Sequence, residues 1–284
     1  MKHNYKKKAV NASVYIGLSI LAVIWILPIL WVILTSFRLE RGSYVTTFFP
    51  KNLTLDNYLL LFTDIGVLNF PRMFMNTLLI ASIACVISCF FVLSVAYCTS
   101  RLRFKLRKPL MNIAMILGLF PGFMSMIAVY YILQALGLSE GAMIKVALIL
   151  VYSAASGTGF YVAKGFFDTI PKALDEAALL DGANKWQIFT RITIPLSRPI
   201  LVYTALSSFL APWVDFIFAR VICRADASQY TVSIGMWRML EYTMIDAWYT
   251  RFAAAAVCVS IPIAILFVVM QKFYAEGMSG AVKG

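Results

Sequence analysis

The chain has 284 residues, of which 61% are hydrophobic and 13% are charged. Soluble domains are about half apolar and a quarter charged, so this composition excludes an ordinary soluble protein and indicates several membrane spans. The net charge is +12, but the basic residues stand between apolar runs, which argues against a nucleic-acid partner. His3 is the only histidine, so histidine-dependent triads and HExxH metal sites are excluded, and we expect no metal site.

Charge-free apolar runs recur along the chain, and about 20 such residues cross the hydrocarbon core as a helix. The first run, Val14–Leu34, has no small-residue cleavage site, so we expect a span that stays in place and not a signal peptide. The prediction is an all-α membrane protein with six transmembrane helices, forming a single transmembrane domain over residues 1–284. The spans are expected at about residues 14–37, 73–100, 109–134, 144–164, 199–220 and 251–273.

The distribution of basic residues predicts the orientation of these spans. Sixteen of the 25 lysines and arginines lie on the side that holds both termini, the 101–108 loop and the 164–198 loop. The net charge is +11 on that side and +1 on the other. The positive-inside rule therefore places both termini and the 164–198 loop in the cytoplasm.

The loop over residues 168–196 predicts a helix–turn–helix. Pro171 suits the first helical position, and Gly182 can end the helix in a left-handed cap. A second short helix is expected from about Asn184 to Thr190. Four residues at helical spacing share one face of the first helix: Leu174, Ala177, Ala178 and Asp181.

Several features of the spans and outer loops allow two interpretations each. Aromatic residues in the segments 38–71 and 224–250 can anchor the chain at the membrane interface or dock an external partner. Small residues crowd the fourth span, with Ser153 and Ala155 each four residues before a glycine, and suit packing within this subunit or against a second one. Asp215 is the only acid inside an apolar run, and it marks either a pathway or a hydrated site near the outer interface.

The chain shows no motif that could supply energy for transport. It has neither a GxxxxGK[ST] phosphate loop nor a GxGxxG motif after a strand. An autonomous secondary carrier would need more charge at the membrane midplane or a repeat of its first half, and an intramembrane enzyme would lack a histidine base. We therefore expect energy to arrive through the 168–196 loop, with the secondary sugar carrier kept as an alternative of another class.

The same loop resembles the EAA loop of binding-protein-dependent ABC importers, whose pattern is EAA-x3-G-x9-I-x-L-P. The match runs through Glu176-Ala177-Ala178, Gly182, Ile192 and Ile194-Pro195, and only Ile194 departs from the pattern, replacing leucine. The C-terminal region is similar to the shorter permease subunit of maltose-type carbohydrate importers. That similarity rests on four stretches: 228–232, 252–256, 271–274 and 276–284.

The resemblance implies a permease subunit that forms half of the translocation pore in a bacterial cytoplasmic membrane, which it crosses several times. Its expected partners are the lipid bilayer, a second and different permease, an ATPase dimer and an extracytoplasmic sugar-binding protein. The substrate would be maltose, maltodextrin or a similar oligosaccharide, with another oligosaccharide or glycerol phosphate as the alternative. The chain would carry no catalytic site and bind no cofactor, because the partner ATPase uses the ATP. In this family the residues that contact sugar lie mainly on the partner permease.

The resemblance also assigns roles to individual residues. The expected ATPase-coupling residues are Glu176, Ala177, Ala178, Asp181, Gly182, Ile192 and Pro195. A C-terminal tail that reaches the ATPase would include Glu276, Gly277 and Lys283, although small residues dominate it and disorder is the alternative. The last outer loop would contact the binding protein through Trp237, Met239 and Tyr242, and the pore candidates are Trp213 and Asp215.

Overall fold

The computed structural model describes residues 2–42, 47–155, 159–224 and 226–281. Over these ranges the chain is helical, and its one β contact is an isolated bridge between Arg38 and Leu53. The predicted all-α class is therefore confirmed. Four helical stretches are long and apolar enough to cross a membrane, and two sharply bent helix pairs raise the number to as many as six.

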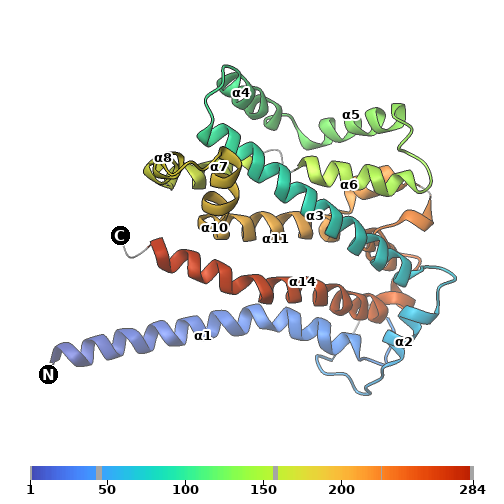
Figure 1. The fold of residues 1–284 in the computed structure, drawn as a ribbon. Coiled ribbons are helices and arrows are strands. Elements are labelled where there is room, and N and C mark those ends of the chain that lie inside the picture. Colours follow the sequence, from blue (N-terminus) through green and yellow to red (C-terminus); the bar gives the residue numbers. More distant parts are fainter. Residues whose placement is uncertain (1, 43–46, 156–158, 225, 282–284) are drawn as a thin grey trace. The chain divides into compact units, whose positions relative to one another are not determined.

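Figure 1 shows the order of the helices along the chain. They are α1 (Lys2–Ser36), α2 (Asp56–Thr63), α3 (Phe70–Arg101), α4 (Arg107–Gly118), α5 (Gly122–Ala135), α6 (Met143–Ala155), α7 (Gly159–Thr169), α8 (Lys172–Leu180), α9 (Lys185–Ile188), the π-helix η2 (Phe189–Thr193), α10 (Ile194–Leu196), α11 (Arg198–Val214), α12 (Ile217–Cys223), the 3-10 helix η3 (Ala227–Gln229), α13 (Val232–Met239) and α14 (Ile245–Ala281).

The structure divides the stretch expected to form the third span. In place of one helix over 109–134 it has α4 and α5, which are bent by 106°. Pro121 lies at the break with extended backbone (φ −57°, ψ 129°). Proline lacks an N–H and disfavours helical backbone at the preceding residue, so the helix ends before it and restarts at Gly122.

The fourth expected span is also made of two helices. The candidate membrane-spanning stretch there is Met143–Thr169, which comprises α6 and α7. Gly157, which belongs to one of the two expected small-residue pairs, lies outside the described residues. The other pair joins Ala155 and Gly159, which are the last residue of α6 and the first of α7. The two pairs therefore fall where the helical segment changes from α6 to α7.

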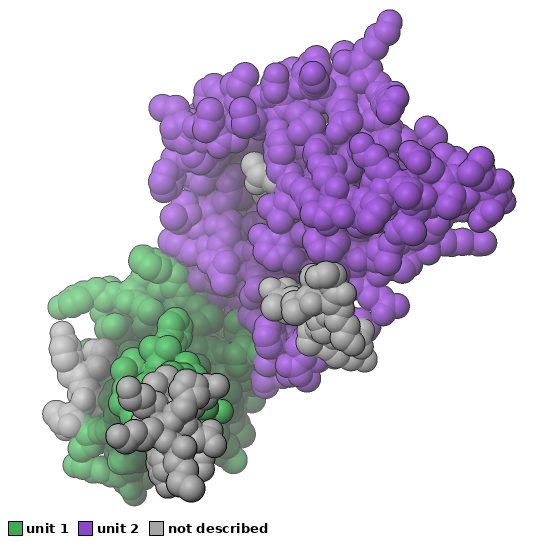
Figure 2. Space-filling model, turned by 90° about the vertical axis from the view of Figure 1, so that its left-hand side faces the viewer, with its two compact units in different colours: residues 1–70, 236–260 green, residues 71–235, 261–284 purple. Residues whose placement is uncertain are grey.

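The chain forms two compact units, shown in different colours in Figure 2: residues 1–70 with 236–260, and residues 71–235 with 261–284. A buried polar network holds the first unit together. Arg38 is 1% exposed and donates to two carbonyls of the following loop. Asn57 donates to the carbonyls of Ser36 and Arg38 and accepts a hydrogen bond from Thr250. This network ties α2 and the end of α1 to α14.

The second unit contains the 168–196 loop and the core beneath it. Ten buried residues of α3, α7, η2, α11 and the α7–α8 connection pack together there: Val92, Leu93, Ala96, Tyr97, Phe160, Ala163, Phe167, Ile170, Phe189 and Ile200. Closer to the N-terminus of α3, the Cys85 thiol donates to the Ala205 carbonyl, and the Ser208 hydroxyl donates to the Ser88 hydroxyl. Both contacts join α3 to α11, so the loop rests on a packed set of helices.

Candidate functional site

The helix α8 forms as its sequence predicts and ends in a glycine cap. Pro171 is the N-cap residue, one position before the first helical position expected for it, and the helix runs from Lys172 to Leu180. Gly182 has φ +83°, in the left-handed region that only glycine adopts readily. The Gly182 N–H donates to Leu179 O at 3.1 Å, and the Ala183 N–H donates to Ala178 O at 2.9 Å. These two bonds make a Schellman cap, so the predicted role of Gly182 in ending the helix is confirmed.

The second helix starts at the expected place but continues further. Asn184 and Gln187 form a capping box in which each side chain accepts from the other residue's backbone N–H. Helical backbone then runs through α9, η2 and α10 to Leu196, and the expected end at Thr190 is therefore too early. Pro195 has no N–H for the regular helical bond, and the preceding turn widens to a π-helix. This continuation carries the chain into α11 through a bend of 82°.

Three contacts from the C-terminal end of α3 hold this helical pair. The Tyr97 hydroxyl donates to Lys185 O at 3.2 Å, next to the start of α9. The Ser100 hydroxyl donates to Asp168 Oδ1 at 2.6 Å, at the end of α7. Arg101, the last residue of α3, reaches α8 itself. One helix end therefore contacts the segment before α8, α8 and the segment after it.

Arg101 makes the most extensive of these contacts. Its Nη2 donates to the carbonyls of Phe167 and Ile170, both at 2.8 Å. Its Nε lies 3.3 Å from Asp175 Oδ2 in an ion pair without hydrogen-bond geometry. The two side chains are only 4% and 16% exposed. The first turn of α8 is therefore fixed to α3 through a largely buried charge pair.

Most of α8 beyond this anchor is exposed, and several of its exposed side chains are apolar. Ala178 is the only buried residue of α8, and of the four residues predicted to share a face it alone packs inward. Glu176, Ala177, Asp181 and Pro195 are exposed, while Ile192 is half-buried. Four large side chains are strongly exposed around them: Leu174 (43%), Leu179 (49%), Leu180 (90%) and Trp186 (63%). Such a surface on a polar segment is typical of a protein contact.

The pore candidates Trp213 and Asp215 lie in different surroundings. Trp213 is 3% exposed and packs against Phe74 and Phe209, so it belongs to a buried aromatic cluster. Asp215 follows the end of α11 and lines a cavity of about 530 Å³ with residues of α5, α6 and α12. Its Oδ1 accepts from the Phe218 N–H at 3.1 Å, and its Oδ2 accepts from the Tyr152 hydroxyl at 2.8 Å. Of the predicted pair, Asp215 alone lines the cavity among the described residues.

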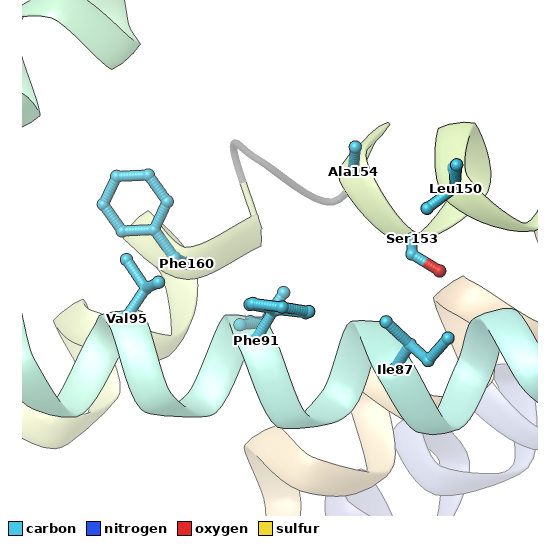
Figure 3. Close-up of a pocket in the computed structure, with 8 residues that line it drawn as sticks. Ile87, Phe91, Val95, Leu150, Ser153, Ala154 and Phe160 are labelled. Carbon is cyan, nitrogen blue, oxygen red and sulfur yellow. The ribbon is translucent and has the colours of Figure 1, made fainter. Parts of the chain in front are cut away.

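A second cavity, of about 320 Å³, lies among residues of α3, α6 and α7, as Figure 3 shows. Apart from Ser153, the side chains around it are apolar. The Ser153 hydroxyl donates to the carbonyl of Ile149 at 2.7 Å, within its own helix. This cavity therefore offers little to a polar ligand.

The remaining predicted residues are dispersed. Trp237 and Tyr242 are 55% and 96% exposed, whereas Met239 is fully buried and packs in the interior. The buried position of Met239 does not fit direct contact with a partner. Glu276 and Gly277 lie in α14, and Lys283 lies outside the described residues.

Sequence reasoning missed Arg101 and Tyr152. Arg101 marked only the end of an apolar run, and its acidic partner in the 168–196 loop lies far along the chain. Tyr152 stands in an apolar run with no local feature that distinguishes it. Both residues act through partners more than 60 positions away, which the local sequence does not identify.

Comparison with known proteins identifies the chain. A family model described as the binding-protein-dependent transport system inner membrane component matches residues 90–280. The chain belongs to this family. The permease is therefore a multi-pass component of the cytoplasmic membrane, and the resemblance carried by the EAA loop is confirmed. Members of the family are permease subunits of ABC importers, which lack an ATPase site of their own.

Two relatives are named as permeases of oligosaccharide transport systems. The permease is 34% identical over 271 residues to the galactooligosaccharides transport system permease protein GanQ of Bacillus subtilis (strain 168), covering 95% of this chain and 94% of that one. It is 30% identical over 271 residues to the maltodextrin transport system permease protein MdxG of the same organism, covering 95% of each chain.

Solved structures support the same fold. A bacterial ABC transporter involved in the import of the acidic polysaccharide alginate matches with a TM-score of 0.76 at 21% identity, covering 95% of this chain and 98% of that one. The MetNI methionine ABC transporter matches with a TM-score of 0.53 at 16% identity, covering 73% and 95%. At these identities the likeness concerns the fold alone.

Proposed function

We propose that this permease forms half of the translocation pore of an ATP-driven importer for oligosaccharides. Its relatives' names favour a galactooligosaccharide or a maltodextrin as the substrate. A second, different permease would complete the pore, an ATPase dimer would supply the energy, and an extracytoplasmic binding protein would deliver the sugar. Both termini and the α8–α10 segment would lie in the cytoplasm, as the excess of lysine and arginine on that side favours.

The observation that carries this proposal is the exposed surface of α8. It presents Glu176 beside small and apolar residues, and the ion pair between Arg101 and Asp175 anchors its first turn to α3. A helix that is exposed on one side and anchored on the other can transmit a displacement. We therefore assign α8 as the coupling helix, with Glu176 pairing with a basic residue of the ATPase and Ala177 allowing close approach.

Transport would follow as a two-state equilibrium. Closure of the ATPase dimer on ATP would move the α8 helices of the two permeases together. Because Arg101 connects α8 to the end of α3, the movement of α8 would reach α3 directly. The packed core would then pass this movement to the other helices that it joins. A ligand shifts such an equilibrium only by its differential affinity for the two states, so ATP must bind the closed dimer more tightly.

The test is co-purification and transport with Glu176→Lys and Gly182→Asp. Glu176 is exposed, so its charge reversal is expected to leave the fold intact while reducing ATPase association at least about tenfold, the effect of losing a charge-assisted contact. Glu140→Lys is the matched control, because Glu140 is also exposed but lies on the side that the charge distribution places outside. Normal transport and ATPase association in both Glu176→Lys and Gly182→Asp would refute the coupling role of α8.

A further inference from the structure

The cavity beside Asp215 holds an acid in an unusual setting. Its walls come from α5, α6 and α12 and are mostly apolar, and among the described residues that line it only Asp215 carries a charge. No lysine or arginine of the described part of the chain forms an ion pair with Asp215. A charged side chain at membrane depth is costly unless it faces a water-filled cavity or a binding partner. The cavity must therefore supply the carboxylate with water or with a polar ligand.

The hydrogen bonds of Asp215 indicate which kind of ligand it can accept. Its two oxygens each accept one bond, from the Phe218 N–H and from the Tyr152 hydroxyl. An ionised carboxylate has about four acceptor sites, so about two remain for a ligand that donates. Vicinal hydroxyl groups of a sugar are donors at a suitable spacing. A phosphate or carboxylate would instead bring like charges together in an apolar cavity.

The shape and surface of the cavity also suit a sugar. Its volume of about 530 Å³ falls in the range of roughly 300–1,000 Å³ that is typical of small-molecule sites. The Phe218 and Tyr152 side chains provide apolar surface against which the C–H face of a pyranose ring can pack, with polar contacts at one end. The cavity of Figure 3 lacks this combination, since its single hydroxyl is bonded within its own helix.

We propose that Asp215 and Tyr152 form a subsite in this subunit for the hydroxyl groups of a neutral oligosaccharide, and that Asp215 disfavours anionic substrates. The inference rests on the proposed function and narrows its substrate class. Asp215 binds the sugar directly, while Tyr152, which is buried, orients the carboxylate. The subsite adds a sugar contact to the subunit whose family resemblance placed such contacts mainly on the partner permease.

The experiment uses proteoliposomes that contain the complete importer with its binding protein. Uptake and ATP hydrolysis are measured in the same vesicles with radiolabelled maltotriose, galactotriose and sn-glycerol 3-phosphate as probes. The variant is Asp215→Asn, because asparagine has similar shape and can still accept from the Phe218 N–H. The matched control is Asp56→Asn, which neutralises an exposed aspartate in the first turn of α2.

The wild type is expected to transport a neutral probe and to exclude the anionic one. Asp215→Asn should lower the sugar transported per ATP about tenfold, the effect of losing one hydrogen bond to a charged group. Tyr152→Phe should show a smaller loss, and Asp56→Asn should match the wild type. ATP hydrolysis stimulated by the binding protein should persist in all variants, since none touches α8.

Each of three outcomes would contradict a different claim. An unchanged sugar-to-ATP ratio in Asp215→Asn overturns the subsite while leaving the importer function intact. In the wild type, uptake of sn-glycerol 3-phosphate, or stimulated ATP hydrolysis without uptake of either neutral probe, overturns the assignment of a neutral sugar. A wild-type chain that fails to recruit an ATPase at all overturns the proposed function itself.

Discussion

Replacing Arg101 tests whether α3 holds the coupling helix. We choose Arg101→Met because methionine keeps the apolar stem of the side chain while removing the guanidinium. The substitution eliminates two hydrogen bonds to the carbonyls of Phe167 and Ile170 and leaves Asp175 without its cation. It therefore isolates the polar part of the anchor.

The magnitude follows from the burial of the pair. Removing one partner of a buried ion pair costs about 3–5 kcal/mol. Asp175 is 16% exposed and can recover some hydration, so we expect the lower end, about 3 kcal/mol. In Asp175→Asn the two carbonyl contacts of Arg101 remain, and the expected cost is smaller, about 1 kcal/mol.

Hydrogen exchange of the α8 amides measures this cost in the assembled transporter in lipid nanodiscs. If α8 opens locally when its anchor is lost, a loss of 3 kcal/mol accelerates exchange by up to about 150-fold. Arg103→Met is the matched control, because Arg103 is exposed two residues further along the chain. Equal α8 exchange rates in Arg101→Met and Arg103→Met would refute the argument. A double variant with Asp175→Asn should show non-additive effects, since the two side chains are in contact.

Three further substitutions test local features, each by thermal unfolding of the purified complex. Gly182→Ala should lower the free energy of unfolding by about 1–2 kcal/mol, because Gly182 has left-handed backbone even though no atom would crowd the added Cβ. In the control Gly165→Ala, where the added Cβ also meets open space but the backbone is not left-handed, stability should be unchanged or higher. Asn184→Ala should cost about 1 kcal/mol through loss of the capping box, and an unchanged midpoint would show that the box adds nothing. Gly235→Ala would place its Cβ against Met73 Sδ, so we expect a loss of about 1–3 kcal/mol, and an unchanged midpoint would show that the Met73 side chain moves aside freely.

The local sequence determined much of the fold class and of the coupling segment. Long charge-free runs have few stable solutions other than helices in a membrane, because an unpaired backbone group in hydrocarbon is costly. The glycine at position 182 indicated a left-handed helix cap, and Gly182 adopts φ +83°. These features depend on neighbouring residues and on the solvent, so periodicity and residue type were sufficient to predict them.

Other features depended on contacts that local patterns do not encode. A run expected to form one helix over 109–134 is divided at Pro121 into α4 and α5, with a bend of 106° whose size the run of apolar residues does not encode. Met239 was expected to contact the binding protein but is fully buried. Arg101 and Asp175 are 74 positions apart in the chain and only 3.3 Å apart in space. A hydropathy pattern reports which residues avoid water, whereas the choice of partner is made by packing, and only the tertiary structure decides it.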